Sequence, residues 1–316
     1  MSTTSTNIQP EMSEELIPSA DELLPEPHAG GGRRRREWAD LLHNSWRFGR
    51  TKVGLIIVGA IVVLAVIGPW IAPHSPYVFV GPPYSAPSAH ALLGTDYLGH
   101  DVLSRVLCGG RTVIVLSLIA TALAMVLGVA LGLIAGYSRP AVDDVIMRLL
   151  DVLLAFPSIV FVLLLVALLG HSLVLIVIAV AVTHAPRIAR VARGATLEIV
   201  GRDFVHASEA LGVPRRKILM GEILPNITSP LLVEFGLRLT YSIGLIAALS
   251  FLGFGLQPPS ADWGLMINEN RQGIVVQPWA VAMPVILIAL LTIGTNLVTD
   301  GISRALIGID RDTGAK

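Results

Sequence analysis

Long apolar runs alternate with short polar segments along most of the chain. A membrane helix needs about 20 mostly apolar residues to cross about 30 Å of hydrocarbon. Six runs approach or reach this length, and they predict transmembrane helices at residues 53–72, 112–135, 146–169, 173 to about 190, 231–252 and 279–298. The fourth run is the weakest, because His184, Pro186 and Arg187 follow its apolar part. We expect these three residues to form its cytosolic end, with a re-entrant segment as the alternative.

The segment before the first apolar run is polar in two different ways. Residues 1–36 are rich in Ser, Thr, Pro, Glu and Gly, which predicts a disordered cytosolic tail. Residues 37–52 mix aromatic side chains such as Trp38 and Trp46 with cations such as Arg50, a mixture typical of an amphipathic helix at the membrane interface. We expect the membrane domain to cover residues 53–310 and a short cytosolic tail to cover residues 311–316.

Composition and charge favour a membrane protein of defined orientation. Of the 316 residues, 53% are hydrophobic and 15% are charged, which excludes an ordinary soluble domain. If the N-terminus is cytosolic, the predicted outer loops at 73–111 and 253–278 contain only three cationic residues, Arg105, Arg111 and Arg271. Because Lys and Arg are enriched in cytosolic loops, we expect both termini to lie in the cytosol.

Motifs for catalysis or for metal binding do not stand out in the sequence. The eight histidines are scattered, no His-Glu-x-x-His zinc motif occurs, and Cys108 is the single cysteine. A Gly-x-x-x-x-Gly-Lys-Ser/Thr phosphate loop is also missing. We therefore expect no catalytic residue, no metal and no cofactor in this chain.

Two patterns inside the predicted membrane helices indicate packing or polar contacts. Gly128, Gly132 and Gly136 recur at every fourth residue, a spacing that lets two helix backbones approach closely in lipid. Glu234 and Arg238 lie four residues apart, so they can pair on one helix face. Charges in membrane helices usually face protein or water. We favour a structural ion pair over a substrate contact for these two residues.

A polar and basic segment at residues 203–225 lies between the fourth and fifth predicted helices. Asp203 is a plausible N-cap of a short helix, and Phe204, Ala207 and Leu211 would share one face of it. Gly212 suits a left-handed stop at the end of that helix. A second short helix would follow, with three cations near its start and a proline near its end, namely Arg215, Arg216, Lys217 and Pro225. This helix–glycine–helix elbow has an apolar face suited to a groove on a soluble partner, although a plain cytosolic loop fits the pattern equally well.

The elbow resembles the coupling motif of ABC importer permeases, in which Glu-Ala-Ala, three residues and Gly precede a helix that ends in Leu-Pro. The matching residues here are His206, Ala207, Ser208, Gly212, Leu224 and Pro225. The chain departs from that motif where His206 replaces the Glu and Ser208 replaces the second Ala. The resemblance implies that the elbow, including Asp203 and Arg215, couples the membrane protein to ATPase subunits.

Two further stretches resemble the dipeptide/oligopeptide/nickel branch of these permeases, and within it the C-type subunit. The first precedes the second predicted helix and contains Gly94, Thr95, Asp96, Gly99, Asp101, Ser104, Arg105, Gly109 and Arg111. The second follows the fifth predicted helix and contains Phe251, Leu252, Gly253, Gly255, Pro258, Asp262, Trp263 and Gly264. In the first stretch His100 stands where the signature usually has Arg. The resemblance covers about residues 45–310.

The resemblance implies a type I ABC importer permease fold in the cytoplasmic membrane of a prokaryote. It also implies four kinds of neighbour: a homologous permease subunit, two cytosolic ATPase subunits that carry ATP and magnesium, an outer substrate-binding protein, and lipid. The implied cargo is dipeptides or short oligopeptides, with nickel or a nickel chelate as the alternative. A secondary transporter that uses Glu234 and Arg238 is a further alternative. An intramembrane enzyme and a passive channel remain open as other classes.

Overall fold

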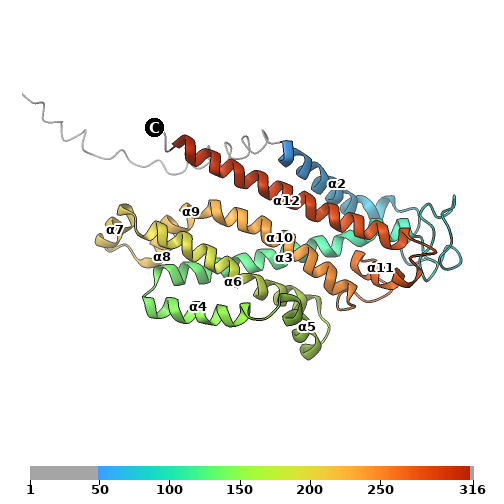
Figure 1. Cartoon of the computed structure of the whole chain (residues 1–316), viewed down its shortest axis with the longest axis horizontal. Coiled ribbons are helices and arrows are strands. Elements are labelled where there is room, and N and C mark those ends of the chain that lie inside the picture. Colours follow the sequence, from blue (N-terminus) through green and yellow to red (C-terminus); the bar gives the residue numbers. More distant parts are fainter. Residues whose placement is uncertain (1–48, 314–316) are drawn as a thin grey trace, which may run out of the picture.

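A computed structural model describes residues 49–313 as an elongated bundle of helices (Figure 1). The predicted tail at 1–36 and most of the predicted interfacial helix at 37–52 lie outside the described residues, as do residues 314–316. The elements in chain order are α2 (Gly49–Ile71), α3 (Val102–Tyr137), α4 (Pro140–Leu154), α5 (Ser158–Leu169), α6 (Leu173–Val200), α7 (Asp203–Ala210), α8 (Arg215–Ile218), the π-helical turn η1 (Leu219–Ile223), α9 (Leu224–Asn226), α10 (Thr228–Phe251), α11 (Trp263–Asn270), the 3₁₀ turn η2 (Arg271–Gly273) and α12 (Trp279–Thr313).

The all-α prediction is confirmed for the described part of the chain. Five of its helices, α2, α3, α6, α10 and α12, are long and apolar enough to cross a membrane, and α4 with α5 make a sixth if that bent pair counts as one span. The elbow lies at one end of the molecule, and the long loop before α3 lies at the other end with α11 (Figure 1). The protein therefore has two polar ends that are joined by apolar helices.

The third predicted helix, at residues 146–169, is wrong as a continuous element. The structure breaks it into α4 and α5, which are bent by 84° relative to each other. The break falls at residues 155–157 and includes Pro157, which lacks a backbone N–H and disfavours a helical conformation at the residue before it. Two salt bridges join α4 to α6. The Nε and Nη2 atoms of Arg193 donate to the Asp143 carboxylate at 2.6 and 2.5 Å. Arg190 pairs with Asp151.

The fourth predicted helix is longer than its apolar run. α6 continues through Pro186 to Val200, so the expected end near residue 190 is wrong. His184 and Pro186 are buried near the middle of α6 instead of lying at a helix end. A proline inside a membrane helix is tolerated where neighbouring helices surround it, and much of α6 is buried among α3, α5 and α10. At the other end of the chain, α12 continues through residues 311–313, which the sequence assigns to a tail.

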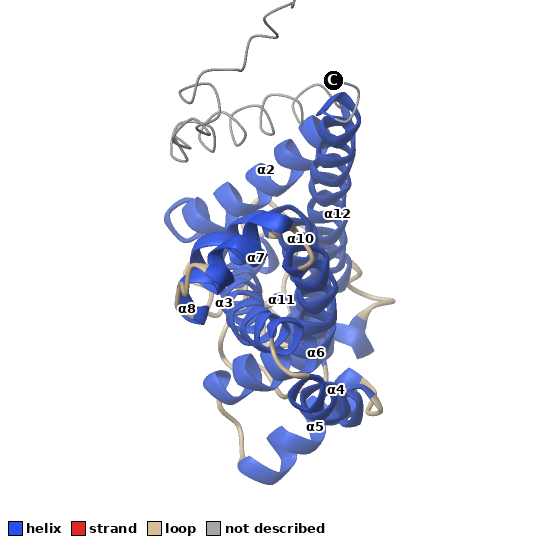
Figure 2. Cartoon of the chain, turned by 90° about the vertical axis from the view of Figure 1, so that its left-hand side faces the viewer, coloured by secondary structure: helices blue, strands red, loops and turns tan. Residues whose placement is uncertain are grey.

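α3 and α6 pack closely along a row of glycines. A Cβ placed on Gly128, Gly132 or Gly136 would lie 2.5–2.7 Å from atoms of α6, which include Ile188, Ala189 and Thr196. Separations below 3.0 Å are not tolerated by real Cβ atoms. Only glycine allows the two backbones to lie this close. The view along the long axis shows α3 and α6 near the centre of the bundle, with α4 and α5 on one side and α12 on the other (Figure 2).

Candidate functional site

The elbow at residues 203–225 is a set of short helices that turn sharply at Gly212. The φ angle of Gly212 is 73°, which lies in the left-handed region that glycine adopts without steric cost. Pro214 precedes α8, and the chain continues without interruption through η1 into α9, where Leu224 and Pro225 lie. The predicted N-cap is wrong by one residue, because Arg202 occupies that position and Asp203 is the first residue of α7. Asp203 still places a negative charge in the first turn, where it suits the helix dipole.

One face of the elbow packs onto the membrane helices. Val205, Ile218 and Ile223 are fully buried and belong to a cluster with Leu133 of α3 and Ala192 of α6. This packing fixes the elbow to the end of the closely packed α3–α6 pair. A displacement of the elbow therefore acts directly on those two helices.

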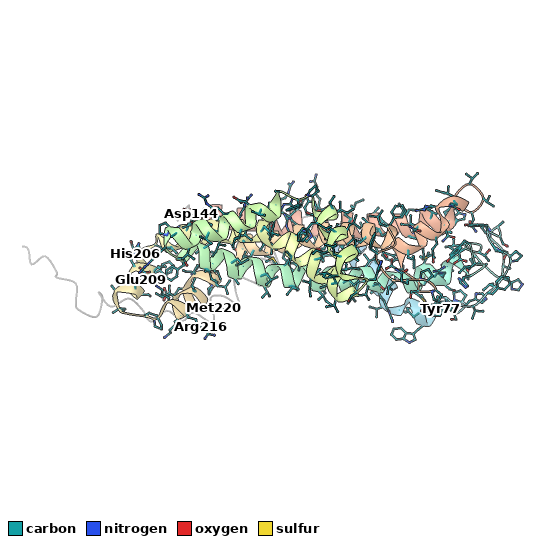
Figure 3. All side chains as sticks on the ribbon, turned by 90° about the horizontal axis from the view of Figure 1, so that it is seen from below. Tyr77, Asp144, His206, Glu209, Arg216 and Met220 are labelled. Carbon is teal, nitrogen blue, oxygen red and sulfur yellow. The ribbon has the colours of Figure 1, made fainter. Side chains whose placement is uncertain are left out.

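Three large apolar side chains of the elbow are exposed among its polar residues. Leu211 is 83% exposed, Met220 is 58% exposed and Phe204 is 45% exposed. Ala207 and His206 are exposed beside them. Figure 3 shows His206, Glu209, Arg216 and Met220 gathered at this end of the molecule, far from Tyr77 at the other end. We name the exposed side chains of Phe204, Leu211 and Met220 the elbow surface.

Polar contacts join the elbow to the end of α3. The Tyr137 hydroxyl donates to Oε1 of Glu209 at 2.7 Å, and the Arg215 guanidinium lies 5.9 Å from the centre of the Tyr137 ring. Within the elbow, the Ser208 hydroxyl donates to Oε1 of Glu222 at 2.8 Å. Ser208, which departs from the family motif, thus connects α7 to η1. No sequence motif indicates the contact between Tyr137 and Glu209.

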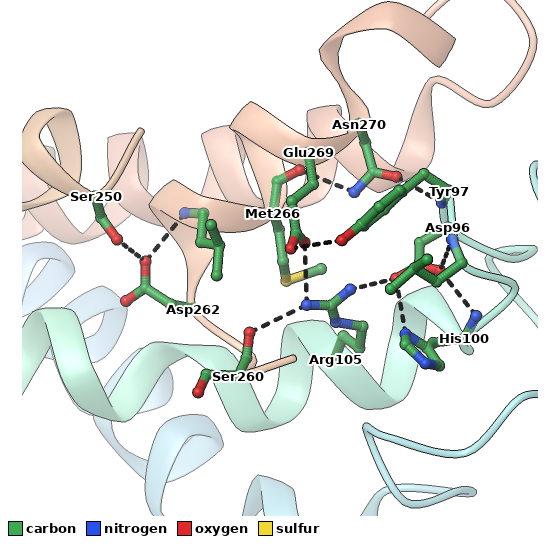
Figure 4. Close-up of polar contacts among 12 residues, drawn as sticks. Asp96, Tyr97, His100, Arg105, Ser250, Ser260, Asp262, Met266, Glu269 and Asn270 are labelled. Atoms are coloured by element: carbon green, nitrogen blue, oxygen red, sulfur yellow. Dashed lines mark hydrogen bonds and ion pairs between the residues drawn. The ribbon is translucent and has the colours of Figure 1, made fainter. Parts of the chain in front are cut away.

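The two signature stretches meet at the other end of the molecule in a buried network around Arg105 (Figure 4). The Arg105 guanidinium pairs with Asp96, lies 3.1 Å from Oε2 of Glu269, and donates to the Ser260 carbonyl at 3.1 Å. Asp96 and Arg105 are both fully buried. Asp96 Oδ1 also accepts from the backbone N–H of His100 at 2.8 Å, so the carboxylate shapes the loop as well as balancing the charge.

Tyr97 and Glu269 complete this network from opposite sides. The Tyr97 hydroxyl donates to Oε1 of Glu269 at 3.0 Å, and the Tyr97 N–H donates to Oδ1 of Asn270 at 3.0 Å. Burial and the Glu269 carboxylate raise the pKa of Tyr97 to about 12. Burial also raises the pKa of Glu269, while Arg105 opposes that shift. Glu269 was not among the predicted site residues. The predicted outer loops contain only three Arg or Lys residues, so an acidic residue such as Glu269 was a candidate partner for one of them.

Trp263 is the main packing contact between the second stretch and α3. Its ring is fully buried, its Nε1 donates to the Val106 carbonyl at 2.9 Å, and it occupies the space beside Gly109 and Gly110. Asp262 caps α11 by accepting from the Leu265 N–H at 3.1 Å. Burial raises the pKa of Asp262.

The other signature residues shape turns and helix ends. Asp101 caps α3 through Ser104, whose N–H donates to Oδ2 of Asp101 at 3.0 Å. Thr95 Oγ1 accepts from Ser85 and donates to the Pro82 carbonyl. The Arg111 guanidinium ties α3 to two carbonyls of α2. The remaining residues lie in the turns of the two stretches or where elements pack closely, and they are Gly94, Gly99, Phe251, Leu252, Gly253, Gly255, Pro258 and Gly264.

Glu234 and Arg238 form an ion pair inside α10, with Arg238 Nε 2.7 Å from Glu234 Oε1. Both side chains are less than 10% exposed, and the guanidinium lies 5.1 Å from the centre of the Tyr241 ring. Among the described residues, no cluster of three or more His, Cys, Asp or Glu side chains could hold a metal ion.

The described chain thus has long apolar helices, with the elbow at one end and the loop before α3 at the other. A solved inward-facing structure of the MetNI methionine ABC transporter has the same fold, with a TM-score of 0.50 and 18% sequence identity over 63% of this chain and 96% of that chain. The fold is therefore that of a type I ABC importer permease.

Sequence comparisons define the family. Residues 128–308 match the inner membrane component of binding-protein-dependent transport systems, and residues 51–93 match the N-terminal transmembrane domain of oligopeptide transport permease C. A di/tripeptide transport permease of Pseudomonas aeruginosa is 36% identical over 85% of this chain and 90% of its own length. A dipeptide transport permease of Alkalihalophilus pseudofirmus is 36% identical over 80% of this chain and 84% of its own. A glutathione transport permease of Escherichia coli strain 536 is 37% identical over 84% of this chain and 89% of its own. This chain belongs to the family of binding-protein-dependent ABC permeases and is a multi-pass inner membrane protein.

Proposed function

We propose that this chain is a permease subunit of an ATP-driven importer of short peptides, and that it is not itself catalytic. Three relatives with at least 36% identity are named for dipeptide, di/tripeptide or glutathione transport, which favours peptide cargo over nickel. The partners would be a second, homologous permease subunit, two cytosolic ATPase subunits that bind ATP and magnesium, and an outer substrate-binding protein. The excess of cations in the predicted cytosolic segments supports cytosolic termini.

The elbow surface is the observation that carries this proposal. An apolar surface at the polar end of a membrane protein has no lipid to cover it, so a soluble partner is the fitting occupant. Burial of a Leu, Met or Phe side chain stabilises a contact by about 1.5–3 kcal/mol. Moving a conformational balance from 1:99 to 99:1 requires about 5.5 kcal/mol of differential interaction. Three side chains that are buried in one conformation of the complex and exposed in the other would supply a free-energy difference of this size.

The test is uptake in proteoliposomes that contain the two permeases and the two ATPases, with the binding protein added outside. We expect uptake of labelled short peptides that requires ATP and the binding protein, and no uptake of nickel. Peptide uptake that continues without the ATPases would favour a secondary transporter. Nickel uptake in place of peptide uptake would replace the proposed cargo.

A further inference from the structure

A polar cluster lies halfway along the membrane helices, away from both the elbow and the Arg105 network. Arg238 is the eleventh of the 24 residues of α10, and His184 is the twelfth of the 28 residues of α6. The two helices pack against each other, and His184 is buried within α6. Ionisable groups at this depth are costly and are retained mainly for function.

The Arg238 guanidinium carries more hydrogen-bond donors than its single contact with Glu234 uses. Nη1 of Arg238 has no hydrogen-bond partner among the described residues. Arg238 Nε and Glu234 Oε1 lie 2.7 Å apart as an ion pair but form no hydrogen bond of good geometry there. Glu234 is the single carboxylate that pairs with Arg238 in the described structure. A guanidinium offers five N–H donors and suits a planar carboxylate. The group that the cluster lacks is an additional anionic acceptor.

The cluster reaches the surface through a face of α10 that does not resemble a lipid contact. Along α10 the exposed residues are Pro230 at its first turn and then Tyr241 and Gly244 near its middle. By contrast, α2 exposes a long series of apolar side chains, including Ile56 and Val63. Arg238 is three residues from Tyr241, and Tyr241 is three residues from Gly244, so each pair is adjacent on the helix surface. Nothing lies within 4 Å of a Cβ placed on Gly244, so the face is open there.

We propose that Arg238, with Tyr241 beside it, binds the carboxylate of the transported peptide midway through the membrane. Glu234 holds the guanidinium in position when no peptide is present, and the peptide carboxylate becomes a second partner of the same guanidinium. Tyr241 forms the open side of the site. This inference rests on the proposed function, because it assigns a step in the passage of a peptide through this chain.

The experiment compares a free-acid peptide with its C-terminal amide in the full reconstituted complex. The probe is the shortest alanine peptide that the wild-type complex imports, and both forms are first shown to load the binding protein. The test variant combines Glu234→Gln with Arg238→Gln, which avoids leaving one buried charge without its partner. The matched control combines Asp151→Asn with Arg190→Gln and removes an exposed ion pair between α4 and α6.

The wild type is expected to import the acid with a higher kcat/KM than the amide. The test variant should lose about tenfold of that preference, the effect of one charge-assisted hydrogen bond, and the control should keep it. Tyr241→Phe should retain most of the preference because the ring remains in place. An unchanged preference in the test variant, or equal losses for both peptides, would overturn the carboxylate site while leaving the importer assignment intact. Absence of ATP-dependent uptake of any alanine peptide by the wild type would overturn both.

Discussion

Leu211→Asp tests the elbow surface most directly, because the change affects a side chain that the fold hardly uses. Leu211 is 83% exposed, so its replacement should leave the packing of α7 and α8 on α3 and α6 unchanged. Nearly the whole side chain is available for burial by a partner, which corresponds to about 1.5–3 kcal/mol. The Asp carboxylate would also lose its hydration in an apolar groove. We therefore expect the dissociation constant between permease and ATPase to rise by about 10- to 100-fold.

The assay is a titration of purified ATPase subunits onto the permease pair in nanodiscs, followed by measurement of peptide-stimulated ATP hydrolysis. Leu92→Asp is the matched control, because Leu92 is 61% exposed but lies in the loop before α3, at the opposite end of the molecule. That variant should bind the ATPases as tightly as the wild type. Unchanged affinity and unchanged stimulation for Leu211→Asp would refute the assignment of the elbow surface to the ATPases.

Three further predictions concern the contacts at the two ends of α3. Tyr137→Phe removes the 2.7 Å hydrogen bond to α7 but keeps the ring, so ATPase binding should persist while the number of peptides imported per ATP falls. Gly110→Val places a Cβ 2.5 Å from the Trp263 ring and should lower the thermal unfolding temperature by several degrees, since overpacking costs about 1–3 kcal/mol. The phenol of Tyr97 should titrate near pH 12 when followed by ultraviolet absorbance. Because its pKa in the folded protein lies above the usual 10.0, the protonated phenol stabilises the folded state below pH 10.0. This contribution is lost as the pH rises towards 12.

Each of these predictions has its own control. Ser208→Ala keeps the Tyr137 contact and isolates the bond inside the elbow. Gly59→Ala adds a methyl group where nothing lies within 4 Å, so its unfolding temperature should match the wild type. Tyr97→Phe should flatten the loss of stability at alkaline pH. Equal stability of Gly110→Val and the wild type, or a Tyr97 phenol that titrates at its usual pKa, would contradict the described packing of the outer end.

The sequence located the apolar part of each single-run span, but α3 begins ten residues before the predicted 112–135, and α12 extends well past the predicted 279–298. It failed at residues 146–169, because hydropathy averages across Pro157 and does not register the backbone break at that residue. The predicted end of α6 near residue 190 is also too early. Polar residues that face other helices lower the hydropathy of the sequence in the same way as residues at a helix end do. The position of Gly212 was predicted from the chemistry of a left-handed turn, and its φ of 73° agrees.

Contacts between distant segments were beyond the reach of the sequence. The signature stretches identify Asp96, Arg105 and Trp263 separately, but only the fold shows that Glu269 closes the network from α11. Tyr137 likewise carries no motif, and its role depends on α7 folding back onto the end of α3. Pairings of this kind depend on tertiary packing, which a local pattern of residues does not encode.

The position of α3 explains why the two polar ends of the molecule can act together. The helix has 36 residues and is therefore about 54 Å long, enough to reach from the Arg105 network to the elbow. Its glycine face packs tightly against α6, so a shift of the elbow would act on both helices together. Arg238 lies on α10, which packs against both α3 and α6. A shift of the α3–α6 pair therefore changes the surroundings of Arg238 and His184 in the same step, which would link ATPase closure to the release of a bound carboxylate.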